Sequence, residues 1–244
     1  MIFDLDGTLV QTEKLKALSY AKAAIELCPH AIRKEQVVEA YKEVVGQSRR
    51  KVAETIMQHF DLEKNVQSRM AEFGVNIPWQ AFVQVRLNHY EAMLADPDVI
   101  RNNRWPHNLA VLEEARQANC KTGLATMSHC AQVNRILEIL ELTDAFDFVA
   151  SLDDVEHWKP DPEIYLLVSD VLQVPPEQCL VIEDSPSGVK AAKAAGMWCI
   201  AVTTPFTRKG VHELGILKER WIVDDPTCVT EVVQQLVAER AKNG

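Results

Sequence analysis

Two aspartates near the start of the chain are the first residues that could do chemistry. Asp4 and Asp6 end a short apolar run, and Gly7 and Thr8 follow directly. In a β-strand, residues i and i+2 lie on the same face, so both carboxylates can face one pocket. Two carboxylates that share a pocket repel each other unless a cation or a proton lies between them. The pair therefore predicts a site that binds a cation or transfers protons.

Polar side chains also follow three later apolar runs. They are, in chain order, Thr126, Met127 and Ser128 after residues 123–125, Lys159 after residues 146–150, and Glu183 and Asp184 after residues 179–182. In an open α/β sheet, ligands bind outside the carboxyl ends of the strands. If these runs are parallel strands, their polar ends meet the two aspartates at one edge of the sheet.

Each of these groups has a chemical role if the ligand is a phosphate ester. Clustered carboxylates suit Mg²⁺, which prefers oxygen ligands. Asp4 could attack phosphorus, and Asp6 could protonate the leaving oxygen and then deprotonate water. Thr126 and the backbone N–H groups before the next helix favour an anion. Lys159 would balance the charge that develops on the phosphoryl oxygens.

Strand-like and helix-like segments alternate from about residue 106 onward. The runs expected to be strands are 123–125, 146–150, 179–182, 198–202 and 221–223. Apolar residues at helical spacing predict two helices, one through Val133, Ile136, Leu137 and Leu140, the other through Ile164, Leu167, Val168, Val171 and Leu172. Ser187 is expected to cap a third helix that ends at Ala195, before Gly196. This alternation predicts a parallel sheet with helices on both faces.

Residues 14–95 have a different pattern, with helical periodicities and few strand-like runs. One apolar stripe is Val37, Val38, Tyr41, Val44 and Val45, ended by Gly46; another is Val52, Ile56 and Phe60, capped by Ser48. Residues 62–79 show no clear pattern. We therefore expect a helical insert between the first strand and the rest of an α/β body.

Composition and motifs exclude several classes of protein. The net charge of −9 is unfavourable for a general nucleic-acid binder. The six cysteines are scattered, which indicates reduced thiols rather than a disulfide framework. There is no apolar run long enough to span a bilayer, no leader pattern and no dinucleotide, P-loop or nucleophile-elbow motif. We expect a cytoplasmic protein with no nucleic-acid or membrane partner, either a monomer or a small homo-oligomer.

Four ordered segments resemble the motifs of the haloacid dehalogenase-like (HAD) hydrolase superfamily. They are residues 4–8 (Asp-Leu-Asp-Gly-Thr), Thr126, residues 159–162 (Lys-Pro-Asp-Pro) and residues 183–188 (Glu-Asp-Ser-Pro-Ser-Gly). The resemblance covers nearly the whole chain. It implies a Rossmann-like doubly wound α/β core at residues 1–13 and 96–244, with a smaller α-helical cap domain at residues 14–95.

The resemblance also implies roles for the motif residues. Asp4 would be the nucleophile and Asp6 the general acid and base. Mg²⁺ would be bound by the Asp4 side chain, the Asp6 backbone carbonyl and Asp184, with Glu183 close by. The phosphoryl group would be bound by Thr126 and Lys159, together with Gly7, Thr8, Met127 and Ser128. Trp158 replaces the usual glycine before the lysine, and nothing in the sequence explains it. Only three residues precede Asp4, which is short for the family and favours a longer natural N-terminus.

The substrate is less clearly indicated than the chemistry. The dehalogenases of the superfamily lack the residue equivalent to Asp6. Its presence favours a Mg²⁺-dependent phosphatase that acts through an aspartyl-phosphate on a small phosphorylated metabolite, with a sugar phosphate as the expected substrate. Thr12, Ser48 and Arg49 resemble cap residues of β-phosphoglucomutase, so a phosphomutase is the alternative. Lys16 stands where that mutase has histidine, which weakens this alternative. A non-catalytic binding or regulatory protein on the same fold is an alternative of another class.

Overall fold

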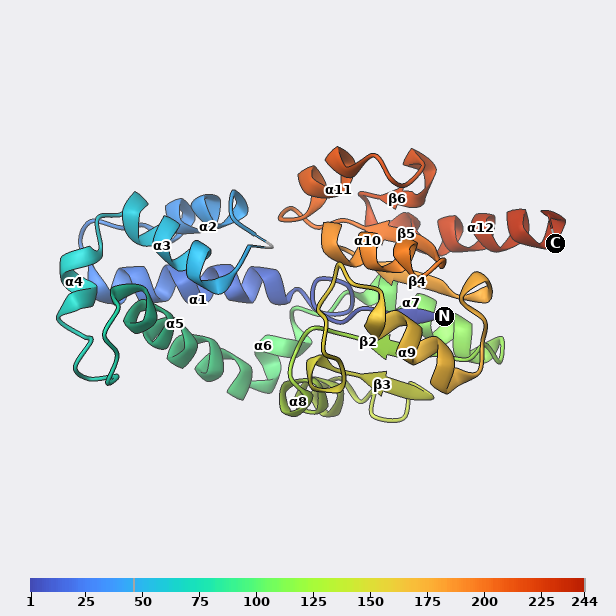
Figure 1. Cartoon of the computed structure of the whole chain (residues 1–244), viewed down its shortest axis with the longest axis horizontal. Helices are drawn as coiled ribbons and strands as arrows, with labels where there is room; N and C mark the ends of the chain where they lie inside the picture. Colours follow the sequence, from blue (N-terminus) through green and yellow to red (C-terminus); the bar gives the residue numbers. More distant parts are fainter. Residues whose placement is uncertain (46, 244) are drawn as a thin grey trace. The chain divides into compact units, whose positions relative to one another are not determined.

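The chain forms two compact units. The computed structural model describes residues 1–45 and 47–243 (Figure 1). One unit consists of residues 1–11 and 100–244, and the other of residues 12–99. Every strand described lies in the first unit, and the second is helical. The sequence places the insert at 14–95, and its action as a cap stays a prediction.

The first unit is built on a parallel sheet. Within the described residues the sheet has six strands, in the order β3-β2-β1-β4-β5-β6. They are β1 (Ile2–Phe3), β2 (Gly123–Ala125), β3 (Phe148–Ala150), β4 (Leu180–Glu183), β5 (Trp198–Val202) and β6 (Ile222–Val223). The chain leaves β1 for β2 on one side and returns to β4 on the other, so the strand order reverses at β1. Such a reversal is where doubly wound folds bind ligands, and the predicted fold class is confirmed.

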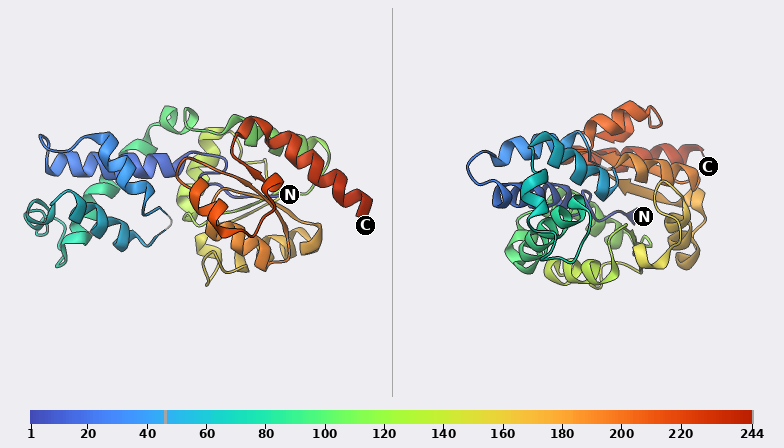
Figure 2. Two further views of the ribbon diagram at one scale, coloured as in Figure 1. Left: turned by 90° about the horizontal axis from the view of Figure 1, so that it is seen from above. Right: turned by 60° about the vertical axis from the view of Figure 1, so that its left-hand side comes forward.

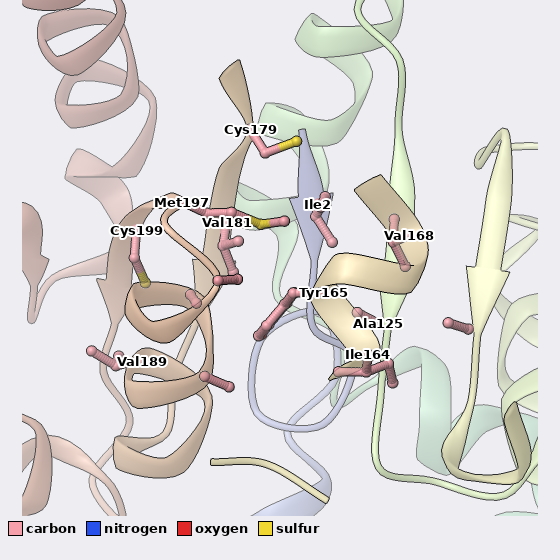
Figure 3. Packing of buried hydrophobic residues seen from close by; sticks show 14 of the residues in the cluster. Ile2, Ala125, Ile164, Tyr165, Val168, Cys179, Val181, Val189, Met197 and Cys199 are labelled. Carbon is pink, nitrogen blue, oxygen red and sulfur yellow. The ribbon is translucent and has the colours of Figure 1, made fainter. Parts of the chain in front are cut away.

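Helices cover both faces of this sheet. Figure 2 shows α9 (Glu163–Leu172) and α10 (Pro186–Ala194) on one side of the strands and α7 (Pro106–Gln117) and α12 (Val229–Asn243) on the other. The strands are apolar on both faces, because both are buried. Ile2, Val181 and Cys199 face Tyr165 of α9 and Val189 of α10 (Figure 3). The same unit contains α8 (Cys130–Leu140) and α11 (Arg208–Leu214), and α6 (Pro97–Arg101) crosses the boundary in the sequence.

Two details of the predicted helices are wrong. The apolar spacing predicts Val171 on the buried face of α9, but its side chain is 47% exposed, and Tyr165 lies on the buried face instead. The N-cap of α10 is Ser185, whose hydroxyl accepts a hydrogen bond from the Gly188 N–H at 3.1 Å, rather than Ser187. Pro186 explains the earlier start, because its fixed φ and missing N–H suit the first helical position.

The second unit consists of α1 (Thr12–Leu27), α2 (Lys34–Lys42), α3 (Arg49–His59), α4 (Glu63–Gln67) and α5 (Pro78–Ala95). Ser48 caps α3 as predicted, since its hydroxyl accepts from the Lys51 N–H at 3.3 Å. The first apolar stripe extends past α2, which ends at Lys42, so Val44 and Val45 lie in a turn. Gly46, the predicted end of that helix, lies outside the described residues. The segment 62–79 contains α4 and the start of α5.

Gly188, in the first turn of α10, lies against the carboxylate of Glu183. Glu183 ends β4 and is 1% exposed. A Cβ at position 188 would overlap the Glu183 carboxylate. The connection between β4 and α10 therefore requires glycine for space, and Gly188 has no positive φ that would require glycine for conformation.

Gly188→Ala is expected to destabilise the protein. Glycine to alanine inside a helix normally stabilises by about 1 kcal/mol, but the overlap with Glu183 should reverse the sign and cost about 1–3 kcal/mol. Urea unfolding followed by circular dichroism measures the difference. Lys190→Ala, at an exposed position of the same helix, is the control and should change stability by no more than about 0.5 kcal/mol. A Gly188→Ala variant as stable as the wild type would contradict the overlap.

Candidate active site

The site begins where the central strand ends. Phe3 pairs with Leu124 on one side and with Ile182 on the other, so the next residues on the three strands are Asp4, Ala125 and Glu183. The Asp4 N–H donates to the Ile182 carbonyl at 3.0 Å. Parallel register therefore places the Asp4 and Glu183 side chains next to each other, and both are buried.

Lys159 links these strand ends. Its Nζ donates to Asp4 Oδ1 at 2.8 Å, to Glu183 Oε1 at 2.8 Å and to the Ala125 carbonyl at 3.0 Å. All three ammonium protons are thus used, and the side chain is 3% exposed. The Nζ also lies 4.7 Å from the centroid of the Tyr165 ring. The predicted convergence of Asp4, Lys159 and Glu183 is present in the structure, although the binding of a phosphoryl group by Lys159 stays a prediction.

Glu183 accepts hydrogen bonds on both oxygens. Oε1 accepts from Lys159 and from the Tyr165 hydroxyl at 3.2 Å. Oε2 accepts from the N–H groups of Asp184 and Ser185, at 2.8 and 2.7 Å, and from the Ser185 hydroxyl at 3.0 Å. Because its oxygens have five donors, Glu183 fits better as a supporting carboxylate than as a direct metal ligand. The sequence analysis does not name Tyr165; its position beside Ile164 is compatible with the apolar face of α9 but does not indicate a hydrogen bond to Glu183.

Asp6 is held by hydroxyl groups. The Thr126 hydroxyl donates to Asp6 Oδ2 at 3.1 Å, and the Ser128 hydroxyl donates to the same oxygen at 2.5 Å. The Ser128 N–H donates to the Thr126 hydroxyl at 3.1 Å. Thr126 and Ser128 thus orient Asp6 in this structure. Their predicted contact with a phosphoryl group stays a prediction.

The start of α8 differs from the expected anion site. Asp153 accepts from the Cys130 N–H at 2.7 Å and contacts the His129 ring at 2.8 Å. The positive end of the helix dipole favours negative charge at this position. The Asp153 carboxylate supplies that charge by accepting from the first N–H of the helix. The Met127 side chain is partly buried and packs against the hydrophobic core. Any phosphate contact near residue 127 would have to come from its backbone.

The turn after β1 is shaped around Asp184. Gly7 has φ of +88°, a conformation that favours glycine. A Cβ on Gly7 would also overlap the Asp184 carboxylate. Thr8 is buried, and its carbonyl accepts from Asn108 Nδ2 at 2.6 Å. Gly7 therefore leaves space for an acid beside the end of the central strand.

Negative charge dominates the electrostatics of the site. Burial raises the pKa of Asp4 to about 7; Lys159 opposes the shift, whereas Glu183 and Asp6 add to it. Burial alone would lower the pKa of Lys159, but Asp4 and Glu183 outweigh it, so that pKa is raised well above its usual range. Lys159 remains charged, and the acids around it outnumber it.

Three of these acids could hold a metal ion. Asp4, Glu183 and Asp184 each offer a carboxylate oxygen, and these oxygens lie within 4.8 Å of one another. All three residues are buried. Buried carboxylates need a compensating charge, and hard oxygen donors are the ligands that Mg²⁺ prefers. Asp4 and Asp184 as direct ligands, with Glu183 supporting them, therefore fit Mg²⁺.

The other predicted substrate residues lie in the second unit. Thr12 is the first residue of α1 and is buried, and its hydroxyl has no hydrogen-bond partner among the described residues. Arg49 is the first residue of α3 and is exposed, directly after the cap residue Ser48. Their roles toward a substrate stay predictions.

In the described part of the chain, no helix is both long and apolar enough to cross a bilayer.

Comparison with known proteins agrees with the fold. A curated phosphorylated carbohydrates phosphatase from Thermotoga maritima is 30% identical over 197 residues, which cover 81% of each chain. A solved structure from Thermotoga maritima, provisionally assigned as a β-phosphoglucomutase, shares 26% identity, covers 96% of this chain and 97% of its own, and gives a TM-score of 0.70. A HAD family hydrolase from Deinococcus radiodurans with bound phosphate and sodium shares the fold, with 21% identity, 96% and 94% coverage and a TM-score of 0.71.

The model of one protein family matches most of the chain. The matching residues are 1–202, which include β1 and the whole of the site described above, and the family is described as haloacid dehalogenase-like hydrolase. Together with the relatives, this match confirms the resemblance that the four motifs indicate. The chain belongs to the haloacid dehalogenase-like hydrolase family.

Proposed function

We propose that this protein is a Mg²⁺-dependent phosphatase that hydrolyses a small phosphorylated metabolite of the sugar-phosphate class. The observation that carries the proposal is the buried Asp4 at the end of the central strand, bound by Lys159 and close to Asp184. The name of the Thermotoga relative, a phosphorylated carbohydrates phosphatase, supports the substrate class. The free cysteines agree with a reducing compartment such as the cytoplasm.

In the first step, an oxygen of Asp4 attacks phosphorus and forms an aspartyl-phosphate. The bond between phosphorus and the ester oxygen breaks, and Asp6 gives a proton to that oxygen as it leaves. Thr126 and Ser128 orient the Asp6 carboxyl group for this transfer through their hydrogen bonds to Oδ2. Lys159 stabilises the negative charge around Asp4.

In the second step, Asp6 acts as a base. It takes a proton from the water molecule that attacks the aspartyl-phosphate, and the bond between phosphorus and Asp4 breaks. Inorganic phosphate leaves, and Asp4 is regenerated as a carboxylate. Asp6 then carries the proton that the next leaving group needs, so no external acid is required.

Asp4, Asp184 and the backbone carbonyl of Asp6 would hold Mg²⁺, with Glu183 supporting them. When bound, Mg²⁺ supplies positive charge that offsets the acids and the phosphoryl oxygens. In the insert, Thr12, Ser48 and Arg49 would contribute to the choice of substrate. Arg49 is suited to an anionic group, because its guanidinium offers several N–H donors.

Asp4→Asn is expected to abolish turnover of p-nitrophenyl phosphate, because an amide is a poor nucleophile toward phosphorus. The rate should fall about 10⁴-fold or more, while circular dichroism shows a folded protein. Asp170→Asn, at an exposed position on α9, is the matched control and should keep wild-type activity. Activity retained by Asp4→Asn would rule out the nucleophile. A wild-type protein inactive with Mg²⁺ on a broad panel of phosphate esters would favour the non-catalytic alternative.

Removal of divalent ions should stop the reaction. Treatment with EDTA is expected to abolish turnover, and added Mg²⁺ should restore it. Asp184→Asn should raise the Mg²⁺ concentration for half-maximal activity by about 10- to 100-fold, and Asp170→Asn should leave it unchanged. Full activity in EDTA, or an unaltered Mg²⁺ dependence in Asp184→Asn, would count against the metal site.

A phosphomutase is the second candidate, favoured by the likeness to the structure with a β-phosphoglucomutase assignment. It differs in the acceptor, because the phosphoryl group on Asp4 would pass to a sugar hydroxyl instead of to water. Incubation with a hexose 1-phosphate and a hexose bisphosphate primer separates the two. The phosphatase should release inorganic phosphate, detected colorimetrically. Isomerised sugar phosphate without free phosphate, seen by ³¹P NMR, would identify a mutase.

A further inference from the structure

The helical insert contains a pocket of its own. The pocket has a volume of about 380 Å³ and is lined by residues of α3, α4, the start of α5 and the turns between them. All of these elements belong to the second unit, in which α5 packs against both α3 and α4 (Figure 1). Sites for small molecules usually have volumes of about 300–1,000 Å³, so the pocket is large enough for a small ligand.

This pocket is separate from the residues discussed above. The described residues that line it include none of those assigned to the candidate active site or predicted to contact a substrate. Met57 of the pocket lies about two turns beyond Arg49 on α3, which corresponds to about 12 Å along the helix axis. A ligand bound here would occupy a second site, so its binding does not depend on the proposed function.

Three acids line the pocket. Glu54 lies on α3, Asp61 lies in the turn that follows, and Glu63 is the first residue of α4. Glu54 pairs with Arg50 at 2.8 Å, but the Arg50 side chain is 67% exposed, and such exposed pairs contribute little. In the described part of the chain, Asp61 and Glu63 form no ion pair; Glu63 accepts a hydrogen bond from the Gln67 side chain at 3.4 Å. These carboxylates therefore remain available to a ligand.

The three acids are a local excess of negative charge. Residues 12–99 contain 12 lysines and arginines and 12 aspartates and glutamates, so the insert is balanced as a whole. Among the described residues that line the pocket, none is lysine, arginine or histidine. Clefts lined by one sign of charge concentrate ions of the opposite sign. The pocket therefore favours a cation from outside the chain.

The rest of the lining favours an organic cation over a metal ion. Met57 is 4% exposed, Ile77 is 47% exposed, and Trp79 adds an aromatic ring. Aromatic faces attract ammonium groups, and apolar side chains cover the methylene groups of long amines. The carboxylates are also too far apart to hold one metal ion together, because they are not among the groups of described acids whose oxygens lie within 4.8 Å of one another.

We propose that this pocket of the helical insert binds an aliphatic amine that has two or more ammonium groups separated by methylene chains. Glu54, Asp61 and Glu63 pair with separate ammonium groups, which matches the spread of their carboxylates. The methylene chains between these groups cover the side chains of Ile77 and Trp79, which are otherwise open to water. Charge and apolar surface are thus satisfied by one ligand.

Isothermal titration calorimetry of the full chain with spermidine tests the site. Saturating Mg²⁺ keeps spermidine from the acids of the candidate active site, and about 0.15 M salt screens attraction to the acidic surface in general. One spermidine should bind per chain. The triple variant Glu54→Gln, Asp61→Asn and Glu63→Gln should bind it at least about 10-fold more weakly. A wild-type chain that binds no spermidine would overturn the proposal.

A matched variant controls for the net charge of −9. Glu35→Gln, Glu39→Gln and Glu43→Gln remove the same amount of charge from exposed positions on α2 and directly after it. The affinity for spermidine should then stay within about twofold of the wild type, and circular dichroism checks that both triple variants are folded. An equal loss of affinity in both would show general attraction to an acidic chain and would overturn the proposal.

Trp79 gives a readout that does not depend on removing charge. Trp79→Leu should weaken spermidine binding by about 2- to 30-fold, and Trp79→Phe, which keeps an aromatic face, should restore part of that loss. Spermidine should change the tryptophan fluorescence of the wild-type chain, and that change should be absent in Trp79→Phe. Undiminished affinity in a folded Trp79→Leu variant would overturn the proposal.

A comparison of ligands on the wild-type chain needs no variant to fold. Putrescine should bind about 2- to 5-fold more tightly than n-butylamine, which has the same carbon chain and one ammonium group fewer. Equal affinity of the two amines would overturn the proposed class of ligand. Stoichiometric displacement of spermidine by Mg²⁺ would identify a metal site instead. These measurements use no ester turnover, so failure of the proposed function and failure of this site are distinguishable.

Discussion

The hydrogen bonds of one buried lysine organise the candidate active site of the first unit. Lys159 Nζ contacts Asp4, Glu183 and the Ala125 carbonyl, so a single ammonium group joins the ends of β1, β4 and β2. The parallel register brings two carboxylates to adjacent positions, where they would repel each other without a cation between them. Lys159 makes that arrangement stable, and it links the loop before α9 to the centre of the sheet.

Several neighbouring residues follow from this charge cluster. Glu183 is surrounded by donors, including the Tyr165 hydroxyl and the Ser185 N–H, because a buried carboxylate must have its oxygens satisfied. Gly188 and Gly7 leave space for the Glu183 and Asp184 carboxylates. The acids still outnumber the lysine, and that remaining negative charge is the physical reason to expect a divalent cation beside Asp4.

The sequence predicted this cluster from strand ends, because the edge of a parallel sheet brings together residues far apart in the chain. Asp4, Lys159 and Glu183 could be found in that way. The Tyr165 hydroxyl and the Asp153 cap of α8 could not, because the partner of a side chain depends on packing between elements.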